Sequence, residues 1–269
     1  MSSDSITIRE VWNENLEEEF KLISNIIDHN HEQKYVAMDT EFPGLVVGRN
    51  QNLNNLDPDA RYQILKKNVD HLKLIQLGLT FSDVSGNLAT CGTGKICSWQ
   101  FTFREFDIHN DPHSKESIEL LTESGIDFGR NLELGVDAER FRSLLMTSGV
   151  MSNPSFKWVV FQGAYDFAYL CKLLSGKSNL PESRAEFLEL MKKYFPVIYD
   201  IKYLAKICSI HSGLGNLATS LDVERVGTAH QAGSDSLLTC RTFWAFIGKY
   251  FGGSLPVQHA GKVHGIGEN

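Results

Sequence analysis

The sequence predicts one α/β domain with a mixed central sheet that is flanked by helices. Apolar residues make up 42% of the 269 residues and charged residues 22%, which is ordinary for a chain that buries a large core. Segments with period-two hydrophobicity come early, and segments with helical spacing surround one later strand. No internal repeat or linker divides the chain, so we expect a single domain over residues 1–252 and a mobile Gly-rich tail over residues 253–269.

The first half of the chain predicts an opening helix and three strands. Apolar side chains recur at helical spacing at the start, whereas two later segments alternate apolar and polar side chains. A Gly-containing turn separates those two segments, which predicts an antiparallel hairpin. In order, the expected elements are a helix (8–27), a strand (35–42), a loop (46–59), a short helix (61–70) and two strands (72–81 and 96–106).

The second half of the chain predicts mainly helices around one short strand. Ser234 has a side chain that favours the N-cap position, so we expect it to begin the final helix. In order, the expected elements are helices (114–124 and 137–148), a strand (157–162), helices (165–174, 182–194, 201–208 and 214–221) and a last helix that ends near residue 251.

Composition and charge exclude several classes of protein. The net charge of −7 argues against a protein that coats nucleic acid with a basic face, although an enzyme could still hold one RNA end in a cleft. No run approaches the roughly 18 apolar residues of a membrane span, and the polar first ten residues are unlike a secretory signal. The five cysteines include no C-x-x-C pair, which disfavours a zinc ribbon and predicts reduced thiols in an intracellular protein.

Asp39 and Glu41 are the first residues with chemical content. They lie two positions apart in a predicted strand, so their side chains point to the same face. Adjacent carboxylates repel each other unless protons or cations compensate them, and Mg²⁺ or Mn²⁺ prefers such oxygen ligands. A solvated strand end is the alternative for this pair taken alone.

Asp166, His230 and Asp235 extend this acidic pattern. Asp166 and Asp235 each fall at the start of a predicted helix, where capping is the alternative role for a carboxylate. His230 lies one short loop before Asp235, and histidine readily takes a proton from water near neutral pH, although an ordinary surface histidine is the alternative.

The joint order of these residues resembles the DEDD exonuclease superfamily in its histidine subtype. That layout has D-x-E on a first strand, an Asp at a middle helix start and H-x-x-x-x-D late in the chain. Four carboxylates suit a two-metal hydrolysis of phosphodiesters, in which one ion activates water and the other stabilises the leaving oxygen.

Longer blocks resemble the Caf/Pop-type deadenylase family, the nuclease subunits of the CCR–NOT complex, and most of all its plant branch. They extend over roughly residues 8 to 252 and are IREVWNENLEEEF (8–20), AMDTEFPG (37–44), DHLKLIQLGLTFSD (70–83), WQFTFREF (99–106), SIELLTESGIDF (117–128), RFRSLLMTSG (140–149), YDIKYL (199–204) and ERVGTAHQAGSDSLLTCRTFW (224–244).

The resemblance implies an RNase D/RNase H-like exonuclease fold for the domain over residues 1–252 and removal of 3′ adenylates as 5′-AMP. It implies two divalent metal ions, Mg²⁺ or Mn²⁺, and a large scaffold with companion deadenylase subunits as partners of an enzyme on single-stranded poly(A) RNA. No membrane is expected, and the locations implied are cytoplasm and nucleus. By position, the metal-binding acids match Asp39, Glu41, Asp166 and Asp235, and the water-activating histidine matches His230.

One segment departs from the family pattern around the third acid. Gln162 replaces a usual histidine, and Ala164 and Ala168 replace usual glycines, which could reshape the turn or crowd the substrate. A smaller departure is Ser212-Gly213, where the family more often has two glycines. Two alternatives therefore stay open: a catalytically weakened scaffold or binding subunit, and a DEDD exonuclease with broader RNA or DNA specificity.

Recognition of the RNA is less readable. Phe42 and Phe167 flank the predicted acids and could stack on bases, with core packing as the alternative. The loop over residues 45–59 could line the RNA entrance. The nearby basic residues that could touch phosphates, or be solvated surface charge, are Arg49, Arg61 and Lys66.

Overall fold

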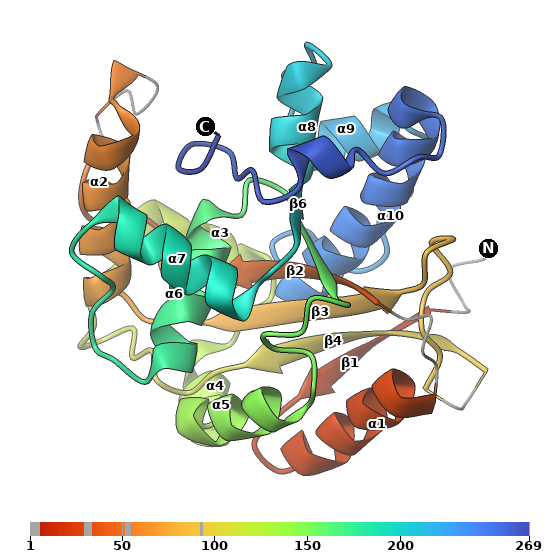
Figure 1. Ribbon diagram of the computed structural model, residues 1–269. Coiled ribbons are helices and arrows are strands. Elements are labelled where there is room, and N and C mark those ends of the chain that lie inside the picture. Colours follow the sequence, from red (N-terminus) through yellow and green to blue (C-terminus); the bar gives the residue numbers. More distant parts are fainter. Residues whose placement is uncertain (1–5, 30–33, 50, 52–54, 92–93, 269) are drawn as a thin grey trace.

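The computed structural model describes residues 6–29, 34–49, 51, 55–91 and 94–268, and it has a six-stranded sheet with helices on both faces (Figure 1). The strands follow the order β1-β4-β3-β2-β5-β6. They are β1 (Ile6–Val11), β2 (Tyr35–Glu41), β3 (Gln76–Ser82), β4 (Ile96–Thr102), β5 (Lys157–Val160) and β6 (Ile198–Asp200).

The sheet is mixed, as the sequence predicts. β3 pairs antiparallel with both β2 and β4, so the expected hairpin of β3 and β4 is confirmed. The other neighbours, β1 with β4, β2 with β5 and β5 with β6, are parallel. In the pairing of β2 with β3, Asp39 lies opposite Gly78 and Glu41 lies opposite Gln76.

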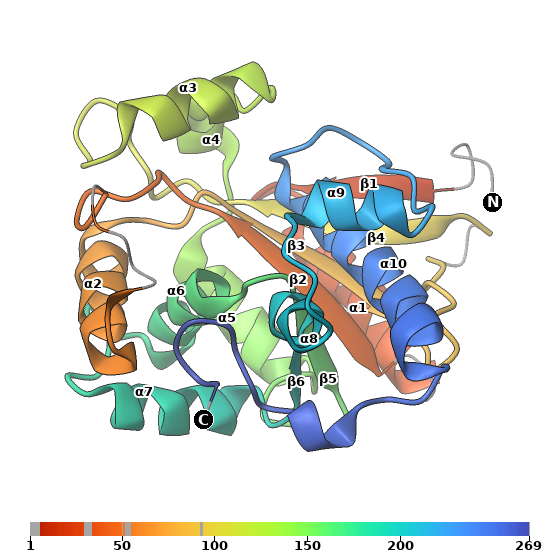
Figure 2. The ribbon, with the colours of Figure 1, turned by 90° about the horizontal axis from the view of Figure 1, so that it is seen from above.

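The helices cover the two faces of the sheet unequally. The long helix α10 contacts strands β1 to β5 on one face, whereas α6 packs against β2 on the other face and against α2, α5 and α7. Figure 2 shows α3 and α4 together, apart from the other helices. The bounds are α1 (Leu16–His29), α2 (Pro58–His71), α3 (Lys115–Glu123), α4 (Phe128–Leu134), α5 (Ala138–Thr147), α6 (Ala164–Ser175), α7 (Arg184–Tyr194), α8 (Ile201–Ile207), α9 (Leu214–Ser220) and α10 (Ala232–Phe251).

Each face of the sheet has its own hydrophobic core because side chains alternate along the strands. Along β2, Val36 and Met38 belong to the core beneath α6, and Tyr35 and Ala37 belong to the core beneath α10. The same alternation continues to the end of the strand, where Asp39 and Glu41 follow on the α10 side.

Among the described residues, no helix has the length and apolar character needed to cross a membrane.

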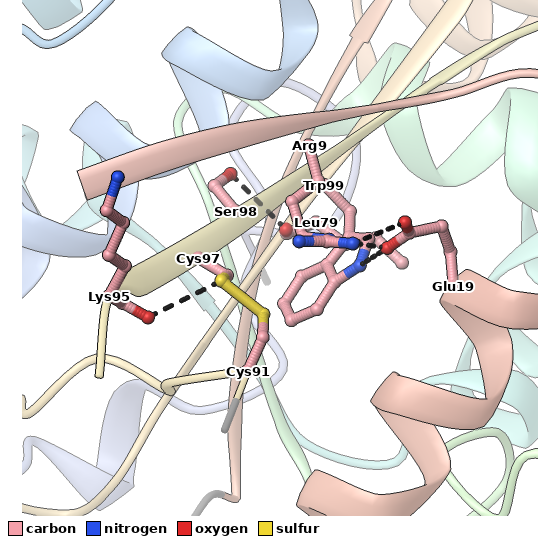
Figure 3. Close-up of a disulfide and its surroundings, with 8 residues drawn as sticks. All are labelled: Arg9, Glu19, Leu79, Cys91, Lys95, Cys97, Ser98 and Trp99. Carbon is pink, nitrogen blue, oxygen red and sulfur yellow. Dashed lines mark hydrogen bonds and ion pairs between the residues drawn. A yellow bond between two sulfur atoms is a disulfide. The ribbon is translucent and has the colours of Figure 1, made fainter. Parts of the chain in front are cut away.

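The start of the chain differs from the prediction. Residues 8–27 were expected to form one helix, but the segment divides into β1 and α1, and β1 adds an edge strand parallel to β4. The two elements are tied together by Glu19, whose carboxylate accepts hydrogen bonds from Arg9 Nε at 2.6 Å and Trp99 Nε1 at 2.9 Å (Figure 3). The short elements α4 and β6 were also not expected.

The segment after α10 corrects the expectation of a mobile tail. Residues 253–268 fold back over the molecule and include one turn of 3₁₀ helix at Val257–His259. Val263 and Ile266 are buried, and the Gly261 N–H donates to the carbonyl of Ile198 at 2.8 Å. This segment is therefore packed against the domain.

The cysteines also differ in part from the expectation of reduced thiols. Cys91 and Cys97 form a disulfide beside the start of β4 (Figure 3). An antiparallel bridge between Thr90 and Ile96 brings the two Cα atoms to 6.2 Å, within the usual range for a disulfide. The three remaining cysteines are free, namely Cys171, Cys208 and Cys240.

Candidate active site

Three of the predicted acids meet at the end of β2. Asp39 and Glu41 point toward α10, and Asp235 lies in the first turn of that helix. One carboxylate oxygen from each of the three lies within 4.8 Å of the other two. The structure therefore brings these three predicted site residues together.

Asp166 lies next to this cluster on the other side of β2. It is in the first turn of α6, as predicted, and its carboxylate is buried. Thr40, which points to the α6 face, donates its hydroxyl hydrogen to Asp166 Oδ1 at 2.6 Å. The Asp166 charge raises the pKa of both Asp39 and Glu41, so the four acids form one electrostatic unit.

Burial and repulsion from neighbouring acids make the carboxylates of Asp39, Glu41 and Asp166 unusually hard to ionise. Burial raises the pKa of Glu41 to about 8, and the charges of Asp235 and Asp166 add to the effect. Burial raises the pKa of Asp166 to about 7, against the opposing hydrogen bond from Thr40. The pKa of Asp39 lies well above its usual range, first because of burial and then because of the three neighbouring acids.

Asp235 is held in place through both of its oxygens. Oδ2 accepts a hydrogen bond from the His230 backbone N–H at 2.8 Å, and Oδ1 pairs with the Arg225 guanidinium at 2.8 Å. His230 has a φ of +62°, so the loop before α10 makes a left-handed turn there. His230 lines the same cavity of about 280 Å³ as Asp39, Glu41 and Asp235.

The donor set fits divalent metal ions. It consists of hard carboxylate oxygens that converge at the cavity and repel one another. The positive charge of Arg225 lowers the pKa of Asp39 and Glu41, but burial and the neighbouring acids raise both by more. The ionised form of such a group of carboxylates becomes favourable when metal cations replace the protons. The acids that could hold the ions are Asp39, Glu41, Asp166 and Asp235.

The two alanines that depart from the family pattern sit in regular helix. Ala164 and Ala168 belong to α6 and are buried in the core between α6 and the sheet. Neither has a positive φ, and neither lines the cavity around the acids. The concern that they crowd the substrate therefore finds no support in the geometry.

Gln162, the third departure, lies in the turn between β5 and α6. It has a φ of +62°, and its backbone N–H donates to Asp200 Oδ1 at 2.9 Å. The buried Asp200 carboxylate also accepts from Gly163 N at 3.3 Å, Lys202 N at 2.9 Å and His264 N at 2.9 Å. Asp200 thus joins this turn to the start of α8 and to the folded-back segment at residue 264.

The proposed RNA contacts have mixed outcomes. Phe167 is fully buried in the core, which agrees with the core-packing interpretation of this residue rather than with stacking on a base. Lys66 forms an ion pair with Asp70 at 2.6 Å. Phe42 is partly exposed but stacks on Tyr165 with ring centroids 5.3 Å apart.

Sequence reasoning missed the two apolar residues that line the cavity. Phe161 and Leu214 bring apolar side chains to its wall. No spacing rule points to them, because one follows a short buried strand and the other begins a short helix. Arg225 was missed for the same reason.

Comparisons with known proteins agree with this fold. The sequence profile of the CAF1 family ribonucleases matches residues 11–141 and 148–243. The chain is 52% identical to the probable CCR4-associated factor 1 homolog 7 of Arabidopsis thaliana, over 99% of this chain and 96% of that protein. It is 41% identical to the poly(A) ribonuclease pop2 of Schizosaccharomyces pombe, over 99% of this chain and 77% of that protein.

Comparison with solved structures also gives ribonucleases of the CAF1 and Pop2 type. The S. pombe Pop2 protein in its Mg²⁺- and Mn²⁺-bound form matches with a TM-score of 0.88 and 40% identity, over 97% of this chain and 99% of that one. Yeast CAF1 co-crystallised with the NOT1 MIF4G domain matches with a TM-score of 0.79 and 29% identity, over 98% and 99% of the two chains. The expected fold class and family resemblance are confirmed.

Proposed function

The chain belongs to the CAF1 family of ribonucleases, and we propose on this premise that it is a poly(A)-specific 3′→5′ exoribonuclease that releases 5′-AMP from mRNA tails. The observation that carries the proposal is the convergence of Asp39, Glu41 and Asp235 in one cavity with His230. A relative at 41% identity that is named as a poly(A) ribonuclease supports the choice of substrate.

Two divalent ions, Mg²⁺ or Mn²⁺, are the cofactors of this proposal, with Asp39, Glu41, Asp166 and Asp235 as their ligands. When bound, the ions lower the pKa of a water molecule and stabilise the leaving oxygen. The raised pKa values of Glu41 and Asp166 mean that these acids release protons when cations enter the site.

His230 is the general base in this proposal, because it lines the same cavity as the acids and an imidazole nitrogen can accept a proton. Its backbone N–H is anchored on Asp235, so the imidazole and a metal ligand are placed as one unit. Thr40 orients Asp166 through its hydroxyl and so links the acid on α6 to the strand that carries Asp39 and Glu41. Phe161 and Leu214 exclude water from the wall of the cavity.

The partners that we propose are single-stranded poly(A) RNA and the scaffold and companion deadenylase subunits of a CCR–NOT complex. The scaffold partner is supported by the likeness to yeast CAF1 co-crystallised with a NOT1 domain. A weakened subunit that serves only as a scaffold is not favoured, because Ala164 and Ala168 lie in helical positions that alanine suits.

The test uses a 5′-labelled RNA that ends in a run of adenosines after a mixed sequence. We expect stepwise shortening with Mg²⁺ or Mn²⁺ that slows at the first non-A residue and stops with EDTA. Poly(U) and single-stranded DNA ends are the controls for broader specificity. No shortening by folded protein with either metal would contradict the proposal, and equal shortening of all three substrates would contradict its poly(A) specificity.

A further inference from the structure

The first turn of α10 is capped by side chains from the sheet. The first backbone N–H groups of a helix have no partner within the helix, and the N-cap residue Gln231 supplies no side-chain cap. Gln76 of β3 accepts the Ala232 N–H at 3.2 Å, and Gln100 of β4 accepts the Gly233 N–H at 3.0 Å. The expected N-cap Ser234 is instead inside the helix and donates to the carbonyl of Val226.

These two glutamines also hold the side chain of Gln231. Gln76 Nε2 donates to Gln231 Oε1 at 3.1 Å, and Gln100 Nε2 donates to the same oxygen at 2.8 Å. Gln231 Nε2 then donates to the backbone carbonyl of Ser124, at the end of α3, at 2.9 Å. We call Gln76, Gln100 and Gln231 the glutamine clamp.

The orientation of every amide in the glutamine clamp follows from the backbone. The N–H groups of Ala232 and Gly233 can only donate, so Gln76 and Gln100 must face them with oxygen. Their NH₂ groups must then face the oxygen of Gln231, which leaves its NH₂ for a carbonyl acceptor. Gln76 and Gln100 are nearly fully buried, where a reversed amide would leave donors unpaired. The clamp is therefore a satisfied network with one arrangement.

The helix start also lies unusually close to the strands. A Cβ on Gly78 of β3 would lie 1.8 Å from the carbonyl oxygen of Ala232, and one on Gly233 would lie 2.8 Å from Gln100 Cβ. The two glycines thus allow the close approach of helix and strands on which the hydrogen bonds of the clamp depend. The contact fixes where the loop before α10 must end.

That loop carries His230, which is held on both sides. Its N–H donates to Asp235 Oδ2 at 2.8 Å. Its carbonyl oxygen lies 3.0 Å from Ser124 Oγ, whose one hydrogen it shares with the Leu121 carbonyl at 2.7 Å. Ser124 therefore contacts both the His230 carbonyl and the Gln231 amide. The left-handed backbone at His230 is disfavoured by itself, so it needs such surrounding contacts to persist.

We propose that the glutamine clamp, together with Ser124, is the positioning device that aims His230, and that Gln231 is its central positioning residue. The inference rests on the proposed function, since it concerns the base of that reaction. Gln231 acts through His230, and its loss displaces the imidazole while the acids remain in place. A displacement of about 1 Å at a reacting group can lower a rate by about 100-fold.

The experiment measures kcat and KM for shortening of the oligoadenylate-tailed RNA by the wild type and Gln231→Ala. We expect kcat to fall by about 10- to 100-fold with KM and Mn²⁺ affinity changed less than about twofold. Gln231→Glu keeps the acceptor for Gln76 and Gln100 and loses the donor to Ser124. Its kcat should therefore lie between those of the wild type and Gln231→Ala. The matched control is Gln63→Ala, which removes an exposed amide that donates to the Glu182 carbonyl on the surface.

A double-mutant cycle separates positioning from general damage to the fold. In a His230→Ala background, Gln231→Ala should change single-turnover rates by less than about twofold. Equal losses in both backgrounds would overturn the inference. If the wild type is active and Gln231→Ala has the same kcat, the inference is also overturned. If the folded wild type is inactive, the proposed function is overturned as well.

A gentler variant covers the case in which Gln231→Ala does not fold. Ser124→Ala removes only the hydroxyl that contacts the His230 carbonyl, and Ser148→Ala at the end of α5 is its control, because both hydroxyls donate to the carbonyl three residues before. We expect a several-fold loss of kcat for Ser124→Ala alone. Equal kcat for the two variants would contradict the positioning role.

Discussion

Replacing Asp39 by Asn should inactivate the protein and stabilise its metal-free form. The substitution keeps the shape of the side chain and removes one of three acids whose oxygens lie within 4.8 Å of one another. Each such pair of charges repels by about 3.5 kcal/mol at an effective dielectric constant of about 20. Without metal, the folded state carries this cost and the unfolded state does not.

Protonation sets an upper limit on the free-energy cost of this repulsion, because Asp39 can take up a proton instead of carrying the charge. Taking up a proton costs about 1.4 kcal/mol for each pH unit above the ordinary pKa of Asp, which is about 6 kcal/mol at pH 8 and about 3 kcal/mol at pH 6. A carboxyl with a raised folded-state pKa contributes stability at low pH and loses it as the pH rises through that pKa. We therefore expect Asp39→Asn to stabilise by at least about 3 kcal/mol at pH 8, and by less at pH 6.

Thermal unfolding in EDTA at the two pH values measures this effect. With about 2–4 °C per kcal/mol for a chain of this size, the Tm should rise by about 6–12 °C at pH 8. Glu133→Gln, an exposed site on α4, removes the same charge and should leave the Tm nearly unchanged. Excess Mn²⁺ should stabilise the wild type and have little effect on Asp39→Asn. A folded Asp39→Asn protein with an unchanged or lower Tm at pH 8 in EDTA would refute the reasoning.

Three further predictions concern the pH dependence, the folded-back segment and the N-terminal contact. Mn²⁺ affinity measured by calorimetry should rise from pH 6 to pH 8 with proton release, because Glu41 with a pKa of about 8 and Asp166 with one of about 7 must ionise to bind; a flat profile would contradict this. Deletion of residues 253–269 exposes core and should lower stability by about 3–6 kcal/mol in urea unfolding, whereas a mobile tail would leave stability unchanged. Glu19→Ala leaves a buried Trp99 N–H and an arginine unpaired and should cost about 3 kcal/mol, with kcat at 25 °C unchanged; an equal loss for the exposed Glu18→Ala would speak against the role of the contact.

The sequence predicted the acidic site well because its signals are local. The period of two along a strand places Asp39 and Glu41 together, and the start of a helix places Asp166. The end of β2 and the hairpin of β3 and β4 also follow from patterns within ten residues. Local patterns do not show that Asp39, Glu41 and Asp166 lie beside Asp235 at the start of α10. That expectation came only from the resemblance of the residue order to a known superfamily.

The errors arose where long-range pairing overrides a local pattern. Acidic and apolar residues continue at helical spacing from Ile8 to Ile27, but Ile8 pairs with Ser98, ninety residues away, and that pairing makes the segment a strand. The cap of α10 shows the same limit, because its acceptor Gln76 is 156 residues from Ala232 and Ser234 has the more suitable side chain locally. Neither contact produces a pattern in the sequence of the neighbouring residues.

The hydrogen bonds around Asp200 have a consequence for the order in which the molecule is completed during synthesis. In the turn before Asp166, the Gln162 N–H donates to Asp200 Oδ1, and Asp200 Oδ2 also accepts the backbone N–H of His264. A ribosome adds residues in sequence, so this donor arrives only after β5, α6 and β6 have been made. The nascent chain therefore carries all four acids before the Asp200 carboxylate, which accepts from the turn before Asp166, has its full set of donors.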